Sequence, residues 1–132
     1  MMEMDIVFPG GARVDAISNG MVITTNQDGS APAPFGLFLA SIGTCAGIYV
    51  ASFCQQRGIP TDNIRIKQRM QVNPLTRMVD HIELDIQLPP DFPEQYKAAV
   101  IRSAELCAVK KHLEQPPTFD VHTSVIEGQL SN

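Results

Sequence analysis

The amino-acid sequence predicts an α+β protein in which antiparallel sheets wrap around one long hydrophobic central helix. Residues 33–54 carry no charge and are long enough for a buried helix. Residues 64–72 and 82–88 alternate apolar and polar side chains with period two, which is the pattern of half-buried strands. The expected order is β-β-β-α-β-β-α-β without a repeat or linker, so we expect one domain over residues 1–132.

Two strand segments, residues 3–8 and 12–25, are expected before the helix. Pro9-Gly10-Gly11 separates them, and Ser18-Asn19-Gly20 divides the second by a hairpin turn, because Asn-Gly favours the tight type I′ geometry. Residues 26–34 are rich in turn-forming residues and are expected to form a loop.

The central helix is predicted over residues 35–57 and ends at Gly58. Small residues recur along it every three or four positions, at Gly36, Ala40, Gly43, Gly47 and Ala51. Such a stripe allows close approach of another backbone, and a symmetry-related copy of this helix is the expected neighbour. The segment is also long enough to span a bilayer. Its small residues dilute the hydrophobicity, so we expect the core helix of a soluble protein with no membrane partner.

The second half is predicted to contain a hairpin, a further helical region and a last strand. The expected elements are strands at 64–72 and 82–88, a helix at 93–106 with a short continuation to 113, and a strand at 119–125. Pro93 suits the first turn of the helix, where a missing N–H costs little, and the pair Pro116-Pro117 ends it.

Composition excludes some classes of function. The net charge of −4 and pI near 5.2 argue against a nucleic-acid partner. Charged residues make up 18% and hydrophobic residues 44%, which favours an oligomer with a buried interface. Three widely spaced cysteines form no disulfide framework and no secretory signal is evident, so a reducing cytoplasm is expected. No three metal-ligating residues share a ligand spacing, so no metal site is expected.

Cys45 and Cys107 carry most of the functional information. Cys45 lies inside the uncharged segment, at the end of the motif Pro34-Phe-Gly-Leu-Phe-Leu-Ala-Ser-Ile-Gly-Thr-Cys, and Cys107 lies in Glu105-Leu-Cys-Ala-Val. One thiol that attacks and one that resolves are the minimum for dithiol peroxide chemistry. Cys54 is expected to be a buried core residue.

These motifs, with Gln56-Arg-Gly-Ile between them, resemble the family of osmotically inducible protein C (OsmC) and organic hydroperoxide resistance proteins. The resemblance covers nearly the whole chain. It implies an OsmC-like fold, an intertwined homodimer with active sites at the subunit interface, and reduction of organic hydroperoxides in oxidative stress defence without a metal, haem or flavin. Cys45 aligns with the peroxidatic cysteine and Cys107 with the resolving cysteine, and an external thiol or dithiol restores the enzyme.

Some residues depart from the family pattern. The family orients a catalytic arginine with a glutamate ten residues before the first cysteine, where this chain has Phe35. Arg13 is the candidate arginine. The family's Cys-Pro-Val is here Cys107-Ala108-Val109. Because Cys45 lies in mid-helix, no helix N-terminus is expected beside it, and desolvation is expected to raise its pKa.

The sequence therefore leaves two hypotheses. The first is a cysteine-based hydroperoxide reductase that uses Cys45, Cys107 and Arg13. The alternative is an OsmC-fold binding or redox-relay protein with little peroxidase activity and an apolar pocket at the dimer interface. The residues expected to line that pocket are Phe35, Phe38 and Tyr49. The distance between the two cysteines is the simplest observation that distinguishes the hypotheses, because a disulfide requires close Cα atoms.

Overall fold

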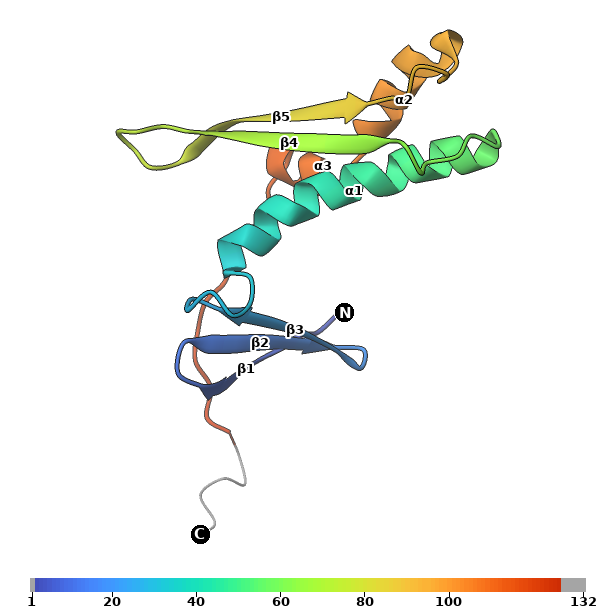
Figure 1. The fold of residues 1–132 in the computed structure, drawn as a ribbon. Coiled ribbons are helices and arrows are strands. Elements are labelled where there is room, and N and C mark those ends of the chain that lie inside the picture. The colour runs from blue at the N-terminus through green and yellow to red at the C-terminus, as the bar shows by residue number, and fades with distance from the viewer. Residues whose placement is uncertain (1, 127–132) are drawn as a thin grey trace.

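The computed structural model describes residues 2–126 and confirms the α+β class, with two antiparallel sheets and a long helix (Figure 1). In chain order, the elements are β1 (Asp5–Gly10), β2 (Arg13–Ser18), β3 (Met21–Asn26), α1 (Pro34–Gln56), β4 (Arg65–Val72), β5 (Val79–Gln87), the 3₁₀ turn η1 (Glu94–Tyr96), α2 (Lys97–Ala104) and α3 (Ala108–Glu114). All of these elements except η1 were expected from the sequence.

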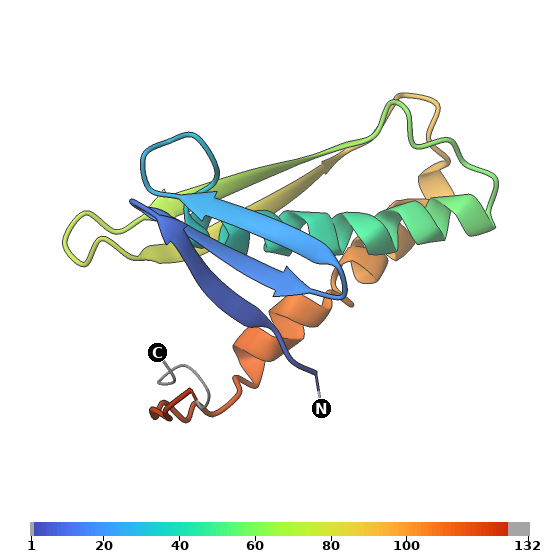
Figure 2. The same ribbon diagram turned by 90° about the horizontal axis from the view of Figure 1, so that it is seen from below.

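The first sheet has the order β1-β2-β3 and contains the predicted hairpin. Asn19 and Gly20 have φ angles of 49° and 75°, as a type I′ turn requires. The sheet lies beside the first turns of α1, on the opposite side of the helix from β4 and β5 (Figures 1 and 2). Several of its apolar side chains, including Ile6, Phe8 and Met21, are exposed.

The core lies between α1, α2 and the β4–β5 hairpin. Pro34 occupies the first turn of α1, and Gly58, with φ 66°, follows the end of the helix. The buried cluster consists of Ala46, Val50, Phe53, Cys54, Phe92, Val100 and Ala104. Alternate residues of the hairpin, among them Ile66 and its cross-strand partner Ile86, pack against this cluster. The hairpin therefore covers one side of α1, as its period-two pattern predicts.

Helices α2 and α3 cover another side of α1. The hydroxyl of Ser103 in α2 donates a hydrogen bond of 3.0 Å to the backbone carbonyl of Tyr49 in α1. The helical region then breaks, and Cys107 becomes the residue that caps the amino end of α3. This break places the start of α3 against the middle of α1 (Figure 2).

One predicted element is wrong. Residues 119–125 form no strand, and the described chain beyond Glu114 has no regular structure. A strand needs a neighbour to pair its backbone N–H and C=O groups, and this segment pairs with none of the described strands. Phe119 and Val121 are accordingly 86% and 91% exposed. Strand β5 also begins at Val79, three residues before the predicted start.

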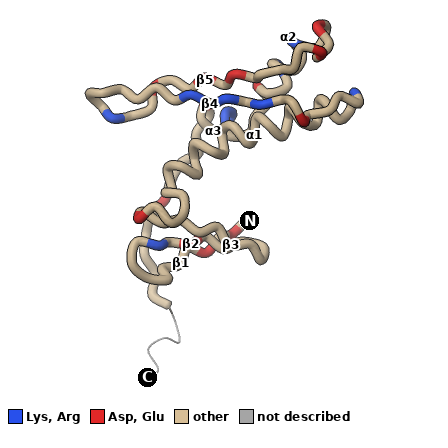
Figure 3. Tube along the Cα trace, in the orientation of Figure 1, with Lys and Arg blue, Asp and Glu red and all other residues tan. Residues whose placement is uncertain are grey.

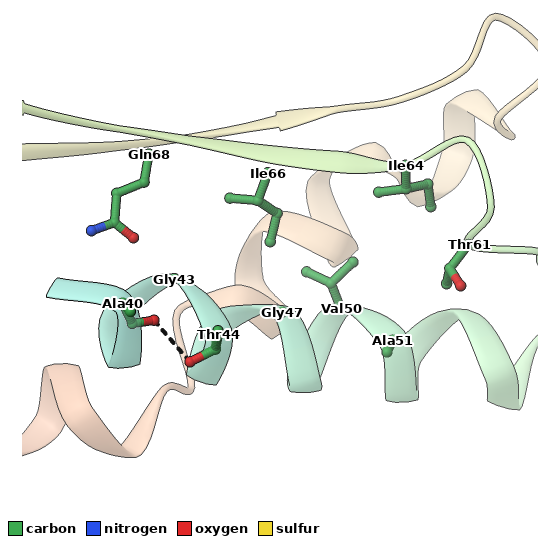
Figure 4. A pocket seen from close by; sticks show the side chains of 10 residues that line it. All are labelled: Ala40, Gly43, Thr44, Gly47, Val50, Ala51, Thr61, Ile64, Ile66 and Gln68. Carbon is green, nitrogen blue, oxygen red and sulfur yellow. Dashed lines mark hydrogen bonds between the residues drawn. The ribbon is translucent and has the colours of Figure 1, made fainter. Parts of the chain in front are cut away.

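Part of the small-residue stripe of α1 faces strand β4 of the same chain. A side chain at Gly43 would meet the Gln68 amide, which donates a hydrogen bond of 2.9 Å to the backbone carbonyl of Leu39. Ile66 lies next along the strand, opposite Gly47 (Figure 4). Within the described residues, α1 is the one helix that is long and apolar enough to cross a membrane. The core helix of a soluble protein can meet the same two criteria.

Candidate functional site

The structure brings Cys45 and Cys107 together. Cys45 lies midway along α1, and Cys107 lies in the turn between α2 and α3. The Cys107 thiol is 3.9 Å from the backbone carbonyl of Ile42, one helical turn before Cys45. The two thiols also lie close enough for each to shift the pKa of the other. Both residues are free thiols in this structure, and Cys45 is the more accessible of the two.

The first turn of α3 stabilises the thiolate of Cys45. The backbone N–H of Val109 contributes most to lowering the Cys45 pKa, followed by the Cys107 thiol and then the N–H of Ala108, against the opposing effect of burial. These amides have no partner within their own helix, because the first N–H groups of a helix never do. Two expectations for Cys45 were therefore wrong: that no helix N-terminus lies beside it, and that its pKa is raised. The helix N-terminus that lowers its pKa belongs to α3 and not to α1.

Cys107 has the opposite electrostatic environment. Burial raises the pKa of its thiol, and a neighbouring Cys45 thiolate raises that pKa further, although the N–H of Lys110 donates to the sulfur at 3.4 Å. Only 2% of Cys107 is exposed. At a pH between the two thiol pKa values, Cys45 is therefore ionised while Cys107 keeps its proton.

Arg13 is held by a carboxylate that the sequence analysis did not single out. Its guanidinium donates two hydrogen bonds, of 3.0 and 2.9 Å, to Asp15 on the same strand. Asp15 is 4% exposed, and the Arg13 guanidinium holds the pKa of its carboxyl below the usual range. Among the described residues the side chain of Arg13 donates to Asp15 and to neither cysteine. Period-two alternation along β2 places both residues on one face, a signal that could have found Asp15.

The three predicted pocket residues do not line either cavity described below. Phe35 and Phe38 stack on each other in the first turns of α1, with ring centroids 5.6 Å apart, and both are exposed. Tyr49 is half-buried, and its backbone carbonyl binds Ser103. A pocket at a dimer interface needs a second chain, so this assignment stays a prediction.

Two cavities flank α1. The first, of about 420 Å³, separates the small-residue face of α1 from β4 and is lined by Gly43, Gly47, Ile66 and Gln68 among others (Figure 4). The second, of about 540 Å³, lies between β5 and the helices α2 and α3, and we call it the Cys107 groove. Cys107 lines this groove, whereas Cys45 lines neither cavity.

Charged side chains are arranged unevenly around the site. Figure 3 shows the cations of β4 beside the acidic residues of β5. Arg69 pairs there with Glu83 at 3.0 Å and with Asp85 at 3.4 Å, so these charges are largely satisfied.

Within residues 2–126, no cluster of three His, Cys, Asp or Glu side chains is suited to holding a metal ion. Cys54 is fully buried, and burial raises the pKa of its thiol.

Comparison with known proteins identifies the family. The model of the family described as OsmC-like protein matches residues 27–122, which is most of the chain. The chain belongs to the OsmC-like family. The matched region includes α1 with Cys45 and the α2–α3 segment with Cys107. No curated protein matches the sequence significantly.

Solved structures share the OsmC-like fold at low sequence identity. A putative osmotic stress induced and detoxification response protein from Psychrobacter arcticus 273-4 is 19% identical, with a TM-score of 0.65 over 84% of this chain and 87% of that chain. A structural-genomics structure is 24% identical, with a TM-score of 0.70 and coverage of 87% and 91%. An OsmC like protein from Mycoplasma pneumoniae is 14% identical, with a TM-score of 0.60 and coverage of 86% and 87%. At these identities the likeness supports the fold alone.

Proposed function

We propose that this OsmC-like protein is a thiol-dependent peroxidase that reduces organic hydroperoxides through Cys45 and Cys107 in defence against oxidative stress. One observation carries the proposal: the fold brings the first turn of α3 and the Cys107 thiol to Cys45, and both lower the pKa of the Cys45 thiol. This arrangement combines a stabilised nucleophile with a second thiol in contact, which dithiol peroxide chemistry requires.

The proposed reaction proceeds in two steps. The Cys45 thiolate attacks the distal peroxide oxygen, the O–O bond breaks, and the alkoxide leaves and takes a proton to become an alcohol. Cys45 is then a sulfenic acid. The Cys107 sulfur attacks the Cys45 sulfur, and hydroxide leaves with the Cys107 proton as water. The product is a Cys45–Cys107 disulfide, which an external thiol or dithiol reduces.

We further propose that the protein acts as a homodimer in the cytoplasm. The exposed apolar side chains of the first sheet support a dimer, because a three-stranded sheet needs a surface on which to bury one face. The three widely spaced cysteines form no disulfide framework, which favours a reducing compartment, where the proposed disulfide would be transient.

Stopped-flow oxidation of the reduced protein tests the activity. Organic hydroperoxides should be consumed with formation of a Cys45–Cys107 disulfide, identified by mass spectrometry. Cys45→Ser should abolish consumption, and Cys107→Ser should leave a sulfenic acid on Cys45 that a dimedone probe traps. Cys54→Ser is the matched control and should retain the activity. Activity that survives Cys45→Ser would contradict the proposal.

A second candidate function is binding or redox relay with little peroxidase activity. The observation that favours it is the Arg13–Asp15 ion pair, which engages the candidate catalytic guanidinium away from both cysteines in this chain. The apolar Phe35 cannot orient a guanidinium in place of a carboxylate. This function would be favoured if diamide forms the Cys45–Cys107 disulfide readily while hydroperoxides oxidise Cys45 no faster than they oxidise a free cysteine.

A further inference from the structure

Only one of the two cysteines of the site lines a described cavity. Cys107 lines the Cys107 groove, whereas Cys45 lines neither cavity and is itself partly exposed. The wall of the groove is largely apolar, with Ile42, Ile82 and Ile86 along α1 and β5. Ile101 and Leu113, which are 53% and 50% exposed, lie toward solvent at its edge.

The groove is large enough for a small molecule to reach sulfur. Its volume of about 540 Å³ lies within the range of ligand cavities. Glu83, Asp85, Glu105 and Lys110 line it together with the apolar residues, so its lining carries more negative than positive charge. A small thiol without an anionic group suits this lining, because the acidic residues would repel a carboxylate. A narrow reductant is also favoured because Cys107 is only 2% exposed.

The two sulfurs of a Cys45–Cys107 disulfide differ as leaving groups because their thiol pKa values are shifted in opposite directions. In thiol–disulfide exchange, the sulfur with the lower pKa leaves faster. The α3 amides lower the pKa of Cys45, and burial raises the pKa of Cys107. Attack on Cys107 therefore expels the better leaving group, Cys45, whereas attack on Cys45 expels the poorer one.

We propose that the Cys107 groove admits the reducing thiol and that this thiol attacks the Cys107 sulfur of the Cys45–Cys107 disulfide. The inference rests on the proposed function, because it concerns the reduction of that disulfide. Peroxide reaches Cys45 by a route other than this groove. The two halves of the catalytic cycle thus use separate approaches to one sulfur pair.

The step balances as follows. A small thiolate forms a bond to the Cys107 sulfur, the disulfide bond breaks, and Cys45 leaves as a thiolate. A second thiol group, from the same dithiol or from another molecule, attacks the reductant sulfur of the mixed disulfide. Cys107 leaves and takes up a proton. Two thiols are oxidised to one disulfide while the protein disulfide gains two electrons.

Trapping of the mixed disulfide tests the site of attack. The wild-type protein is oxidised with diamide, so the disulfide forms even if the peroxidase proposal fails. It is then mixed briefly with 2-mercaptoethanol, quenched with N-ethylmaleimide and mapped by mass spectrometry. We expect mercaptoethanol on Cys107 and maleimide on Cys45. The reverse assignment, or no Cys45–Cys107 disulfide after diamide, would overturn the inference.

Obstruction of the groove tests the route. Leu113→Trp should slow reduction of the disulfide by dithiothreitol by about tenfold, because access controls exchange. The matched control, Lys111→Trp, lies on the same helix outside the groove lining and should leave the rate within about twofold. Oxidation by a small hydroperoxide should be unaffected in both variants. Equal slowing in both variants, or equal slowing of oxidation and reduction by Leu113→Trp, would refute the separate route.

Discussion

At the scale of single residues, backbone amides dominate the environment of Cys45. The family pattern has proline directly after the second cysteine, and proline has no N–H to donate. This chain has Ala108 there, and its N–H is one of the groups that lower the Cys45 pKa. The chain therefore lacks the family's acidic residue at Phe35 but has an additional donor at the start of α3.

Replacing Ala108 with proline removes this donor alone, because proline is well tolerated at the first position of a helix. We expect Ala108→Pro to raise the Cys45 pKa and to slow hydroperoxide reaction at neutral pH by less than about tenfold, since Val109 and Cys107 still donate. The rate should fall as pH falls through the Cys45 pKa, at a higher pH in the variant. Second-order rates across pH measure this, with Ala108→Ser as control. Superimposed pH profiles would contradict the role of the amide.

The Arg13–Asp15 pair predicts a pH-dependent stability. The folded-state pKa of Asp15 is lowered by Arg13, so the pair contributes stability above the unfolded pKa, near ~3.9, and loses it as pH falls through the folded pKa. Asp15→Asn should therefore be less stable than wild type at pH 7 and closer to it near pH 3. Urea unfolding at both pH values measures the difference. An equal difference at the two pH values would show that the ion pair contributes nothing.

At the scale of elements, α1 holds the molecule together. Its carboxyl-terminal half packs against α2, η1 and the β4–β5 hairpin, and its middle positions Cys45 against α3. The ring of Phe53 lies in this half, edge-on to Tyr96 with centroids 5.8 Å apart, and the guanidinium of Arg57 lies 3.8 Å from its centroid. This aromatic cluster fixes the end of α1 to η1.

Truncation of Phe53 should therefore be severe. Phe53 is 8% exposed, and removal of a buried phenylalanine ring leaves a cavity as well as losing hydrophobic burial. We expect Phe53→Ala to lower the free energy of unfolding by about 3–5 kcal/mol. Leu75, which is 91% exposed in the β4–β5 turn, supplies the control, and Leu75→Ala should change stability by less than about 0.5 kcal/mol. Chemical denaturation measures both.

At the scale of the whole molecule, one chain leaves much apolar surface uncovered. The first sheet exposes Phe8 by 80% and Met21 by 66%, and the segment after α3 exposes Phe119. Large exposed apolar surfaces mark sites of interaction with a partner. A second copy of the chain is the partner that the family resemblance implies.

We therefore expect a stable homodimer in solution. An obligate interface buries upwards of about 2,000 Å² and is core-like in composition. Light scattering should give a dimer at micromolar concentration, and the midpoint of urea unfolding should rise with protein concentration. A stable monomer with a concentration-independent midpoint would remove the dimer from the proposed function.

Local patterns in the sequence were sufficient to predict most of the helices and strands. Alternation of apolar and polar residues located β4 and β5, and an Asn-Gly pair located the hairpin between β2 and β3. The uncharged run between Pro34 and Gln56 located α1. These features succeed because helix and strand periodicities are properties of neighbouring residues. The motifs also singled out Cys45 and Cys107, which the fold brings together; their catalytic roles stay a prediction.

Contacts between distant segments had to come from the folded chain. No local pattern indicates that the N–H of Val109 donates to Cys45, since that depends on how α3 docks on α1. Residues 119–125 have the alternation of a strand, yet pairing needs a neighbour that this chain does not place there. Periodicity specifies which face of an element can be buried. Packing decides what lies against that face, and the lowered pKa of Cys45 follows from packing.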